Sequence, residues 1–141
     1  MRIKISFTTS FVYSTNIPVR ISDINYGGHV GNDSILSILH EARLRYLKQW
    51  GYTEMEAGGC GLIMADSAIQ YKGEAFYGDD LLVEIAIDNI NSIAFDIFYK
   101  VSTLRNEKEI SIVYAKTGMI CFDYNTRNIM TMTDELREKL M

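Results

Sequence analysis

The stretch that decides the fold is NDSILSILHEARLRYLKQW, residues 32–50. Its apolar residues recur with the spacing i, i+4, i+7, i+11 and i+15, which is the period of an amphipathic helix. The apolar stripe consists of Ile35, Leu39, Ala42, Tyr46 and Trp50. Asn32 or Asp33 is the predicted N-cap, and Gly51 stands where the end of a helix favours glycine. The sequence therefore predicts one helix of about five turns.

The other regular segments have the composition of strands. Residues 11–21 are rich in Val, Ile, Tyr and Thr, and Pro18 indicates an edge position or a bulge. Later strands are predicted at residues 61–71, 80–90, 94–104 and 109–124, with a hairpin connection at 91–93. Residues 53–59 are read as a short stretch that can be helical. A closing helix is predicted after a cap at Thr133 or Asp134. Consecutive strands after a single long helix predict an α+β fold with an antiparallel sheet.

Composition limits the class of protein. The 141 residues are 48% hydrophobic and 23% charged, which predicts a single globular domain over residues 1–141. The net charge of -4 argues against nucleic acid or an anionic membrane as a partner, since both require a basic surface. No apolar run reaches the length of about 20 residues that a membrane span needs. We expect no membrane insertion.

The two cysteines, Cys60 and Cys121, lie in apolar surroundings and are predicted to be free buried thiols. This usage is typical of the reducing cytoplasm, which is the predicted location. With two histidines and no Cys/His spacing, the sequence predicts no metal site.

The strands carry apolar residues on both alternating faces. In residues 61–71 one set is Ile63, Ala65 and Ile69, and the other is Leu62, Met64 and Ala68. One helix covers one face of a sheet, and a large exposed apolar face promotes association. We therefore expect a homodimer or a dimer of dimers.

Immediately before the helix the chain reads SDINYGGHVGND, residues 22–33. A helix N-terminus offers free backbone N–H groups and the positive end of the helix dipole. Gly27, Gly28 and Gly31 would let a ligand approach this backbone closely. The simpler alternative is a glycine turn followed by a helix cap, with nothing bound.

Several segments, taken in order, resemble one known family. They are the loop with D-x-N and G-H-V-x-N, the helix ending HEARLRYLKQWGY, the segment IQYKGEAFYGDDLLVEI, and AKTGMICFDYNTRNIMTMTDELREKL. From Val19 to Leu140 this order resembles the hot-dog thioesterases of the 4-hydroxybenzoyl-CoA thioesterase-like group. The resemblance implies a hot-dog fold, in which a curved antiparallel sheet wraps around one long helix and two subunits join their sheets. It also implies hydrolysis of an acyl thioester of coenzyme A or acyl-carrier protein, with no metal or redox cofactor and coenzyme A only as part of the substrate.

The resemblance assigns roles to the loop. The backbone N–H of Asn32 stands where the family polarises the thioester carbonyl, and His29 either contacts the thioester or water or fixes the loop. The substrate would also meet the neighbouring loop residues Asp23, Gly27, Gly28, Val30, Gly31 and Asp33.

One departure from the family concerns the catalytic carboxylate. Many relatives read D-x-D-x-x-G-H-V-N-N, and their second aspartate is the nucleophile or general base. This chain has Asn25 there, and a neutral amide is a poor base. Gly31 also replaces the first asparagine of the relatives' pair.

Three explanations remain open for Asn25. Another carboxylate can act, and Asp66 is the most informative candidate because a carboxylate within LIMADSAI is costly unless it is hydrated, paired or functional. For Asp66 the other reading is a strand residue that faces solvent, whereas Asp23 suits fixing the loop and Asp33 suits a cap. Alternatively Asn25 and His29 orient water, or hydrolysis is lost and the protein only binds acyl thioesters. A hot-dog dehydratase is disfavoured, because the long helix shows no expected base and His40 is interpreted as structural.

Overall fold

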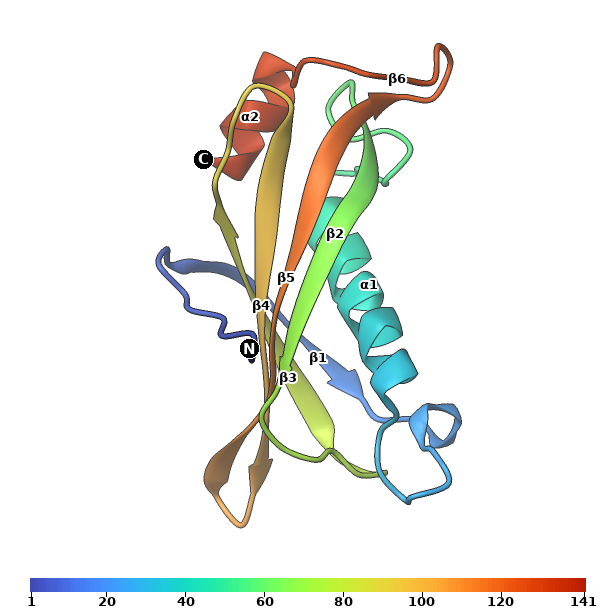
Figure 1. The fold of residues 1–141 in the computed structure, drawn as a ribbon, viewed down its shortest axis with the longest axis vertical. Helices are drawn as coiled ribbons and strands as arrows, with labels where there is room; N and C mark the ends of the chain where they lie inside the picture. The colour runs from blue at the N-terminus through green and yellow to red at the C-terminus, as the bar shows by residue number, and fades with distance from the viewer.

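A curved antiparallel sheet wraps around one long helix in the computed structural model, which describes residues 1–141 (Figure 1). The elements are β1 (Phe11–Pro18), a 3-10 turn (Ile21–Asp23), α1 (Asn32–Lys48), β2 (Gly61–Tyr71), β3 (Asp80–Asp88), β4 (Ala94–Arg105), β5 (Lys108–Asp123), β6 (Asn128–Ile129) and α2 (Asp134–Leu140). The sheet order is β1-β3-β4-β5-β2, with β6 paired to β5 and every pairing antiparallel. The predicted α+β architecture is confirmed, and Pro18 lies at the end of an edge strand.

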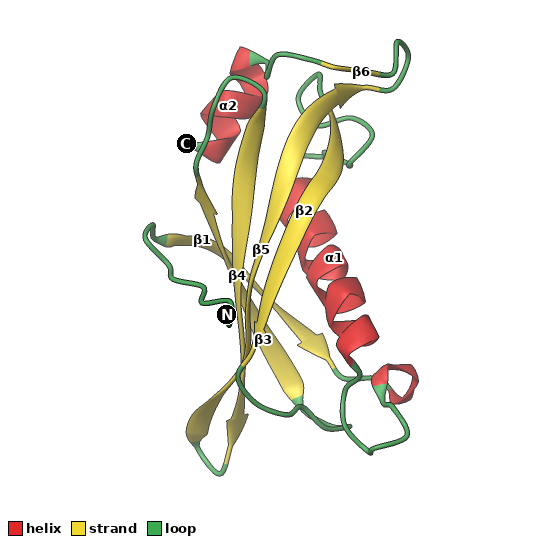
Figure 2. Cartoon of the chain, in the orientation of Figure 1, coloured by secondary structure: helices red, strands yellow, loops and turns green.

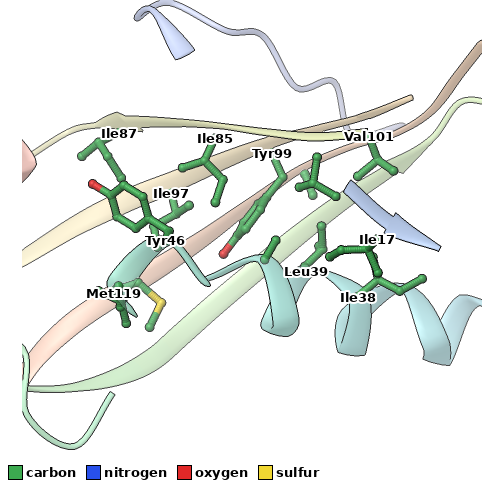
Figure 3. Close-up of a cluster of buried hydrophobic side chains, with 14 of the residues drawn as sticks. Ile17, Ile38, Leu39, Tyr46, Ile85, Ile87, Ile97, Tyr99, Val101 and Met119 are labelled. Atoms are coloured by element: carbon green, nitrogen blue, oxygen red, sulfur yellow. The ribbon is translucent and has the colours of Figure 1, made fainter. Parts of the chain in front are cut away.

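The core lies between α1 and the inner face of the sheet (Figure 3). Four residues of the predicted helix stripe are buried, and Trp50 at its end is half-buried. The helix residues Leu39 and Tyr46 meet sheet residues such as Ile85, Ile97 and Tyr99. The helical period therefore locates the buried side of α1 correctly.

The two ends of α1 are closed in different ways. The N-cap is Gly31, which has no side chain to offer, so the predicted caps Asn32 and Asp33 are wrong and are instead the first two helical residues. Gly51 behaves as predicted. It has φ +75°, and Tyr52 beyond it donates its N–H to the carbonyl oxygen of Leu47 at 3.1 Å, which is a glycine-terminated helix end.

The short helix considered for residues 53–59 is absent. Gly58 and Gly59 have φ values of +62° and +94°, in the left-handed region that a right-handed helix does not use. They form a turn that Ala57 and Cys60 close through paired backbone hydrogen bonds. At the C-terminal helix, the predicted cap Thr133 is confirmed, because Leu136 donates its N–H to the Thr133 hydroxyl at 3.2 Å.

A bulge in β2 changes which of its side chains share a face. The register with β5 shifts between Met64 and Asp66, so Met64 lies opposite the buried Met119 whereas Asp66 lies opposite Gly118. One extra residue reverses the facing of the rest of the strand. The two apolar sets of this strand therefore do not divide cleanly between two faces, which weakens the sequence argument for a dimer.

The N-terminal segment covers part of the outer face of the sheet, the face turned away from α1. Phe7 packs against Phe11, Phe98 and Tyr114, with ring centroids 5.2, 6.4 and 5.0 Å away. Ile5 donates its N–H to Oε1 of Gln70 at 3.0 Å. The chain thus shields by itself some of the apolar surface that the sequence assigns to a partner.

The cysteines agree with their predicted state. Cys60 and Cys121 are buried free thiols, and burial raises the pKa of Cys121 to about 12. Among the helices, none combines the length and the apolar character that crossing a membrane requires.

Candidate functional site

The segment before α1, residues 24–31, which we call the glycine loop, meets the β2–β3 connector, residues 72–79, at one end of the sheet. Figure 2 shows both beside the N-terminus of α1, with α2 at the opposite end. Val30 donates its N–H to the carbonyl oxygen of Ala75 at 2.8 Å, which joins the two segments. Between them lies a cavity of about 270 Å³, lined by His29, Val30, Asn32, Ile35, Tyr71, Gly73, Glu74, Ala75, Ile112 and Val113. We call it the loop cavity.

The first turn of α1 supplies unused donors beside the loop cavity. The carbonyl oxygen of Gly31 accepts the N–H groups of Ser34 and Ile35. The N–H groups of Asn32 and Asp33 have no acceptor in the protein, because the first N–H groups of a helix have no intrahelical partner and the glycine N-cap offers no side chain. Together with the helix dipole, they make this point favourable for a negatively charged oxygen.

His29 is half-buried and presents one free nitrogen. Its Nδ1 lies 3.1 Å from the carbonyl oxygen of Val30. A carbonyl oxygen only accepts, so Nδ1 carries the proton of the neutral ring and Nε2 is left as an acceptor. The protein therefore fixes the tautomer of a histidine that lines the loop cavity.

Asn25 is folded into the turn and does not line the loop cavity. Its Oδ1 accepts the N–H of Gly27 at 2.9 Å, and its own N–H bonds to the carbonyl oxygen of His29 at 2.9 Å. Gly28 follows with φ +84°, a conformation that favours glycine. Asn25 thus shapes the turn.

Gly31 leaves room for the side chain of Asp33. A Cβ atom at residue 31 would lie 2.5 Å from Oδ1 of Asp33 and 3.5 Å from Cβ of Asn25. The glycine that replaces the relatives' asparagine therefore accommodates an exposed carboxylate in the first helical turn. Asp33 does not line the loop cavity.

Asp23 is buried and fully engaged with the loop. Its carboxylate accepts the backbone N–H of Arg20 at 2.8 Å and pairs with the Arg20 guanidinium, and its carbonyl oxygen accepts the N–H of Gly31 at 3.0 Å. These bonds hold the start of α1 against the 3-10 turn. A carboxylate committed in this way is not available as a base.

Asp66 is not brought to the loop within the chain. On the outer face of the sheet, its Oδ1 accepts hydrogen bonds from Lys116 Nζ at 2.8 Å and from the N–H of Gly118 at 3.1 Å. The hydrogen bond from Lys116 lowers the pKa of Asp66, whose side chain is 63% exposed. Within one chain Asp66 therefore lies away from the loop cavity, because the bulge turns it to the outer face, and its catalytic role stays a prediction.

Glu74 is a lining residue that sequence reasoning missed. It is the one carboxylate among the residues that line the loop cavity. The available signal was its place directly after the β2 segment, within IQYKGEAFYGDDLLVEI. Connector residues look like ordinary turn residues until the fold closes them against the glycine loop.

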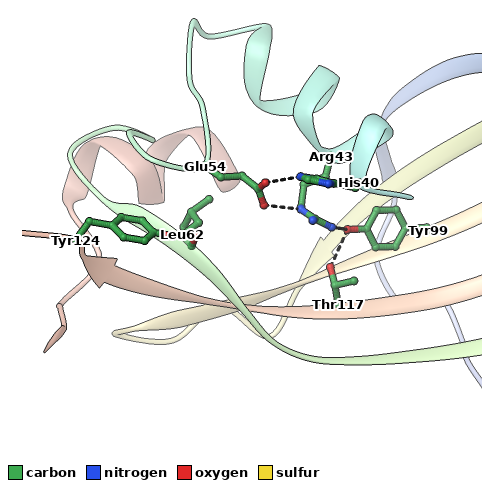
Figure 4. Close-up of polar contacts among 7 residues, drawn as sticks. All are labelled: His40, Arg43, Glu54, Leu62, Tyr99, Thr117 and Tyr124. Atoms are coloured by element: carbon green, nitrogen blue, oxygen red, sulfur yellow. Dashed lines mark hydrogen bonds and ion pairs between the residues drawn. The ribbon is translucent and has the colours of Figure 1, made fainter. Parts of the chain in front are cut away.

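A second polar cluster, which we call the Arg43 network, lies farther along α1 (Figure 4). Buried Arg43 donates to Glu54 at 2.9 Å and to the Tyr99 hydroxyl at 3.2 Å, and Tyr99 shares a 2.7 Å hydrogen bond with Thr117. Burial raises the pKa of Tyr99, and the Arg43 charge opposes that rise. His40 contacts Glu54 at 2.6 Å, so it belongs to this network rather than to the loop cavity.

A larger hollow, of about 410 Å³, lies on the outer face of the sheet. Its lining includes Leu82, which alternates with the core residues Leu81 and Val83, and the acidic residues Asp79, Asp80 and Glu109. Asp79 is paired with Arg105 and Glu109 with Lys100, so only the Asp80 carboxylate lacks a cationic partner. The lining of this hollow includes neither a histidine nor a residue of the α1 N-terminus, which the loop cavity has.

The fold and the loop cavity define a class of protein, and the comparisons agree. A model of the thioesterase-like superfamily matches residues 19–140, so the chain belongs to that superfamily. The curved sheet around α1 is the hot-dog fold that the sequence predicts.

Solved structures share this fold. A 1,4-dihydroxy-2-naphthoyl-CoA thioesterase from Synechocystis has 20% identity and a TM-score of 0.79, with 91% of this chain and 94% of that chain covered. The Escherichia coli protein YbaW has 25% identity and a TM-score of 0.74, with coverages of 90% and 95%. A 4-hydroxybenzoyl-CoA thioesterase mutant in complex with 4-hydroxybenzoyl-CoA has 15% identity and a TM-score of 0.79, with coverages of 92% and 98%. No curated protein matches the chain.

Proposed function

We propose that this protein hydrolyses an acyl thioester of coenzyme A or acyl-carrier protein, giving the free acid and the thiol, at the loop cavity. The observation that carries the proposal is the unused N–H of Asn32 at the start of α1, on a residue that lines this cavity. When water attacks a thioester, the carbonyl oxygen becomes negatively charged. A preorganised N–H donor at a helix N-terminus stabilises that oxygen more than it stabilises the neutral carbonyl.

His29 has the geometry to hold the attacking water. Nδ1 is tied to the Val30 carbonyl, so Nε2 is left to accept a hydrogen bond from water beside the carbonyl. Ile35, Ile112 and Val113 give the same cavity apolar walls that suit the acyl group. Coenzyme A takes part only as the leaving group of the substrate, and the proposal requires no metal or redox cofactor.

We further propose that a second copy of the chain completes the site. The loop cavity of one chain, about 270 Å³, is smaller than the range of about 300–1,000 Å³ usual for ligand pockets. β2 is an edge strand with no partner on its outer side, and Met64 on it is exposed, as are Leu36 and Leu44 on α1. Light scattering should give twice the 16.1 kDa chain mass, or four times for a dimer of dimers. A stable monomer at micromolar concentration would contradict this part of the proposal.

A cytoplasmic location is also proposed, because Cys60 and Cys121 are free thiols and disulfides are rare in reducing compartments. Cell fractionation checks it, and recovery of the protein outside the cytoplasm would contradict it.

The test of the proposed function is a hydrolysis screen with short, long and aromatic acyl-CoA thioesters and acyl-carrier-protein thioesters, read as released thiol. We expect one free thiol for each acid formed, with saturation kinetics for the preferred acyl group. Binding of acyl-CoA without release of thiol would instead favour the binding protein considered above. The same screen identifies the acyl group and the carrier.

A further inference from the structure

The catalytic site of the proposed function lacks a carboxylate where the relatives have one. Asn25 occupies that position and is folded into the turn. Asp23 is committed to Arg20, and Asp66 lies on the outer face with Lys116. Hydrolysis at neutral pH nevertheless benefits from a group that accepts the proton of the attacking water.

Glu74 is in the right place to accept that proton. It lines the loop cavity together with His29 and Asn32, so the three residues border a common space. Its side chain forms no hydrogen bond or ion pair within the protein. The nearby Asp79, by contrast, is held by Arg105 at 2.6 Å. A carboxylate without a protein partner is free to bind water or substrate.

The backbone on both sides of Glu74 is fixed. Before it, Gly73 packs so closely on β5 that a Cβ atom would lie 2.7 Å from the carbonyl oxygen of Ser111. After it, the carbonyl oxygen of Ala75 accepts the N–H of Val30 at 2.8 Å, which ties the connector to the glycine loop. Arg105 also donates to the carbonyl oxygen of Glu74 itself at 2.5 Å. The Cα of Glu74 is therefore held relative to the start of α1, although its side chain is exposed and can turn.

The Arg105 anchor is itself stable near neutral pH. Partial burial alone would raise the pKa of Asp79. Hydrogen bonds from Arg105 and from the Phe76 N–H outweigh this effect and hold the pKa below its ordinary value of 3.8. A lowered pKa means that this ion pair contributes stability above pH 3.8 and loses it only as the pH falls through the still lower folded-state pKa. Above that range the connector keeps Glu74 at the cavity.

We propose that the carboxylate of Glu74 is the general base of the reaction, a role that rests on the proposed function. It takes a proton from water while the water oxygen bonds to the carbonyl carbon, and the carbonyl electron pair moves to the oxygen at the Asn32 N–H. The tetrahedral intermediate then collapses, the C–S bond breaks, and the proton on Glu74 passes to the leaving sulfur. The products are the acid and the thiol, and Glu74 returns as a carboxylate.

The test compares Glu74→Gln with the parent enzyme on its best acyl-CoA substrate. A general base contributes typically about 10²–10⁴-fold, so kcat should fall by at least about 10²-fold with little change in KM. Glu74→Asp, which keeps the carboxylate, should retain more of the parental kcat than Glu74→Gln. The melting temperature should stay at the parental value, because the Glu74 side chain has no partner to lose. Glu138→Gln, an exposed position in α2, is the matched control and should match the parent in every measurement.

The outcomes separate this assignment from the proposed function. A parent enzyme that hydrolyses thioesters while Glu74→Gln keeps its kcat overturns the role of Glu74 and leaves the function standing. The same holds if Asp33→Asn lowers kcat by about 10²-fold and Glu74→Gln does not. A parent protein that releases no thiol from any thioester overturns both.

Discussion

The loop cavity and the Arg43 network are both rich in polar groups, but they differ in how those groups are satisfied. In the Arg43 network each polar group has a partner inside the chain, from Glu54 through Tyr99 to Thr117. At the loop cavity, the N–H of Asn32, Nε2 of His29 and the Glu74 carboxylate have none. The comparison suggests that satisfied groups stabilise the fold, whereas open ones at a cavity are reserved for substrate and water.

Burial explains why the two regions differ. The Arg43 side chain is 6% exposed, and a charge there is tolerable only with close partners. No buried side-chain nitrogen or oxygen in the chain lacks a partner. Glu74 and Asn32 are exposed, so water satisfies their open groups until a ligand replaces it. Each region therefore predicts a different response to mutation.

The largest expected effect on stability is at Arg43. Arg43→Ala leaves Glu54 without its buried partner and should lower the free energy of unfolding by about 3–5 kcal/mol. Turnover per folded molecule should stay near the parental value, because this network does not line the loop cavity. Urea denaturation and active-site titration measure the two quantities.

Arg45→Ala on the same helix is the matched control for Arg43. Arg45 is partly exposed; it pairs with Glu41 and also donates to the Thr15 hydroxyl and to the carbonyl oxygen of Asn16. Its loss should cost about 1–2 kcal/mol, less than the loss of Arg43. Equal losses of stability for the two variants would contradict the claim that a buried ion pair matters more to the fold than an exposed one.

At the loop cavity the expected effect is on turnover. His29→Ala removes the nitrogen that holds water, and loss of one such group typically costs about 10²-fold in rate. The melting temperature should change little, since the ring forms one hydrogen bond to the neighbouring Val30. Steady-state kinetics and thermal unfolding of the same preparation measure the turnover and the melting temperature. A variant that unfolds earlier but keeps its specific activity would show that the loop only caps α1.

The smallest expected effect is at the cap of α2, far from the loop cavity. Thr133→Ala removes the hydroxyl that accepts the Leu136 N–H and should cost about 1 kcal/mol of stability. Its kcat and KM should equal those of the parent. A fall in kcat at constant stability would show that satisfied polar groups at the far end also serve the reaction.

The sequence predicts what local patterns determine. The stripe from Ile35 to Tyr46 and the hairpin across residues 91–93 follow from periodicity and turn residues, because burial selects them directly. The β2 bulge breaks the alternation that places Asp66 on a face, and a one-residue shift gives no signal in composition. The cap at Gly31 and the place of Glu74 depend on contacts between segments distant in the chain, such as Val30 with Ala75. The sequence therefore did not predict that the glycine loop pairs with the β2–β3 connector.

The central claim is that a thioester carbonyl sits at the start of α1, and a crystal structure with an acyl-CoA analogue tests it most directly. In the analogue a methylene group replaces the thioester sulfur, so the carbonyl remains and hydrolysis stops. We predict that the carbonyl oxygen lies about 3 Å from the backbone nitrogen of Asn32. The Glu74 carboxylate should hold a water on the face of the carbonyl carbon. An analogue bound in the acidic hollow beside Leu82, or with its carbonyl turned away from Asn32, would contradict the account.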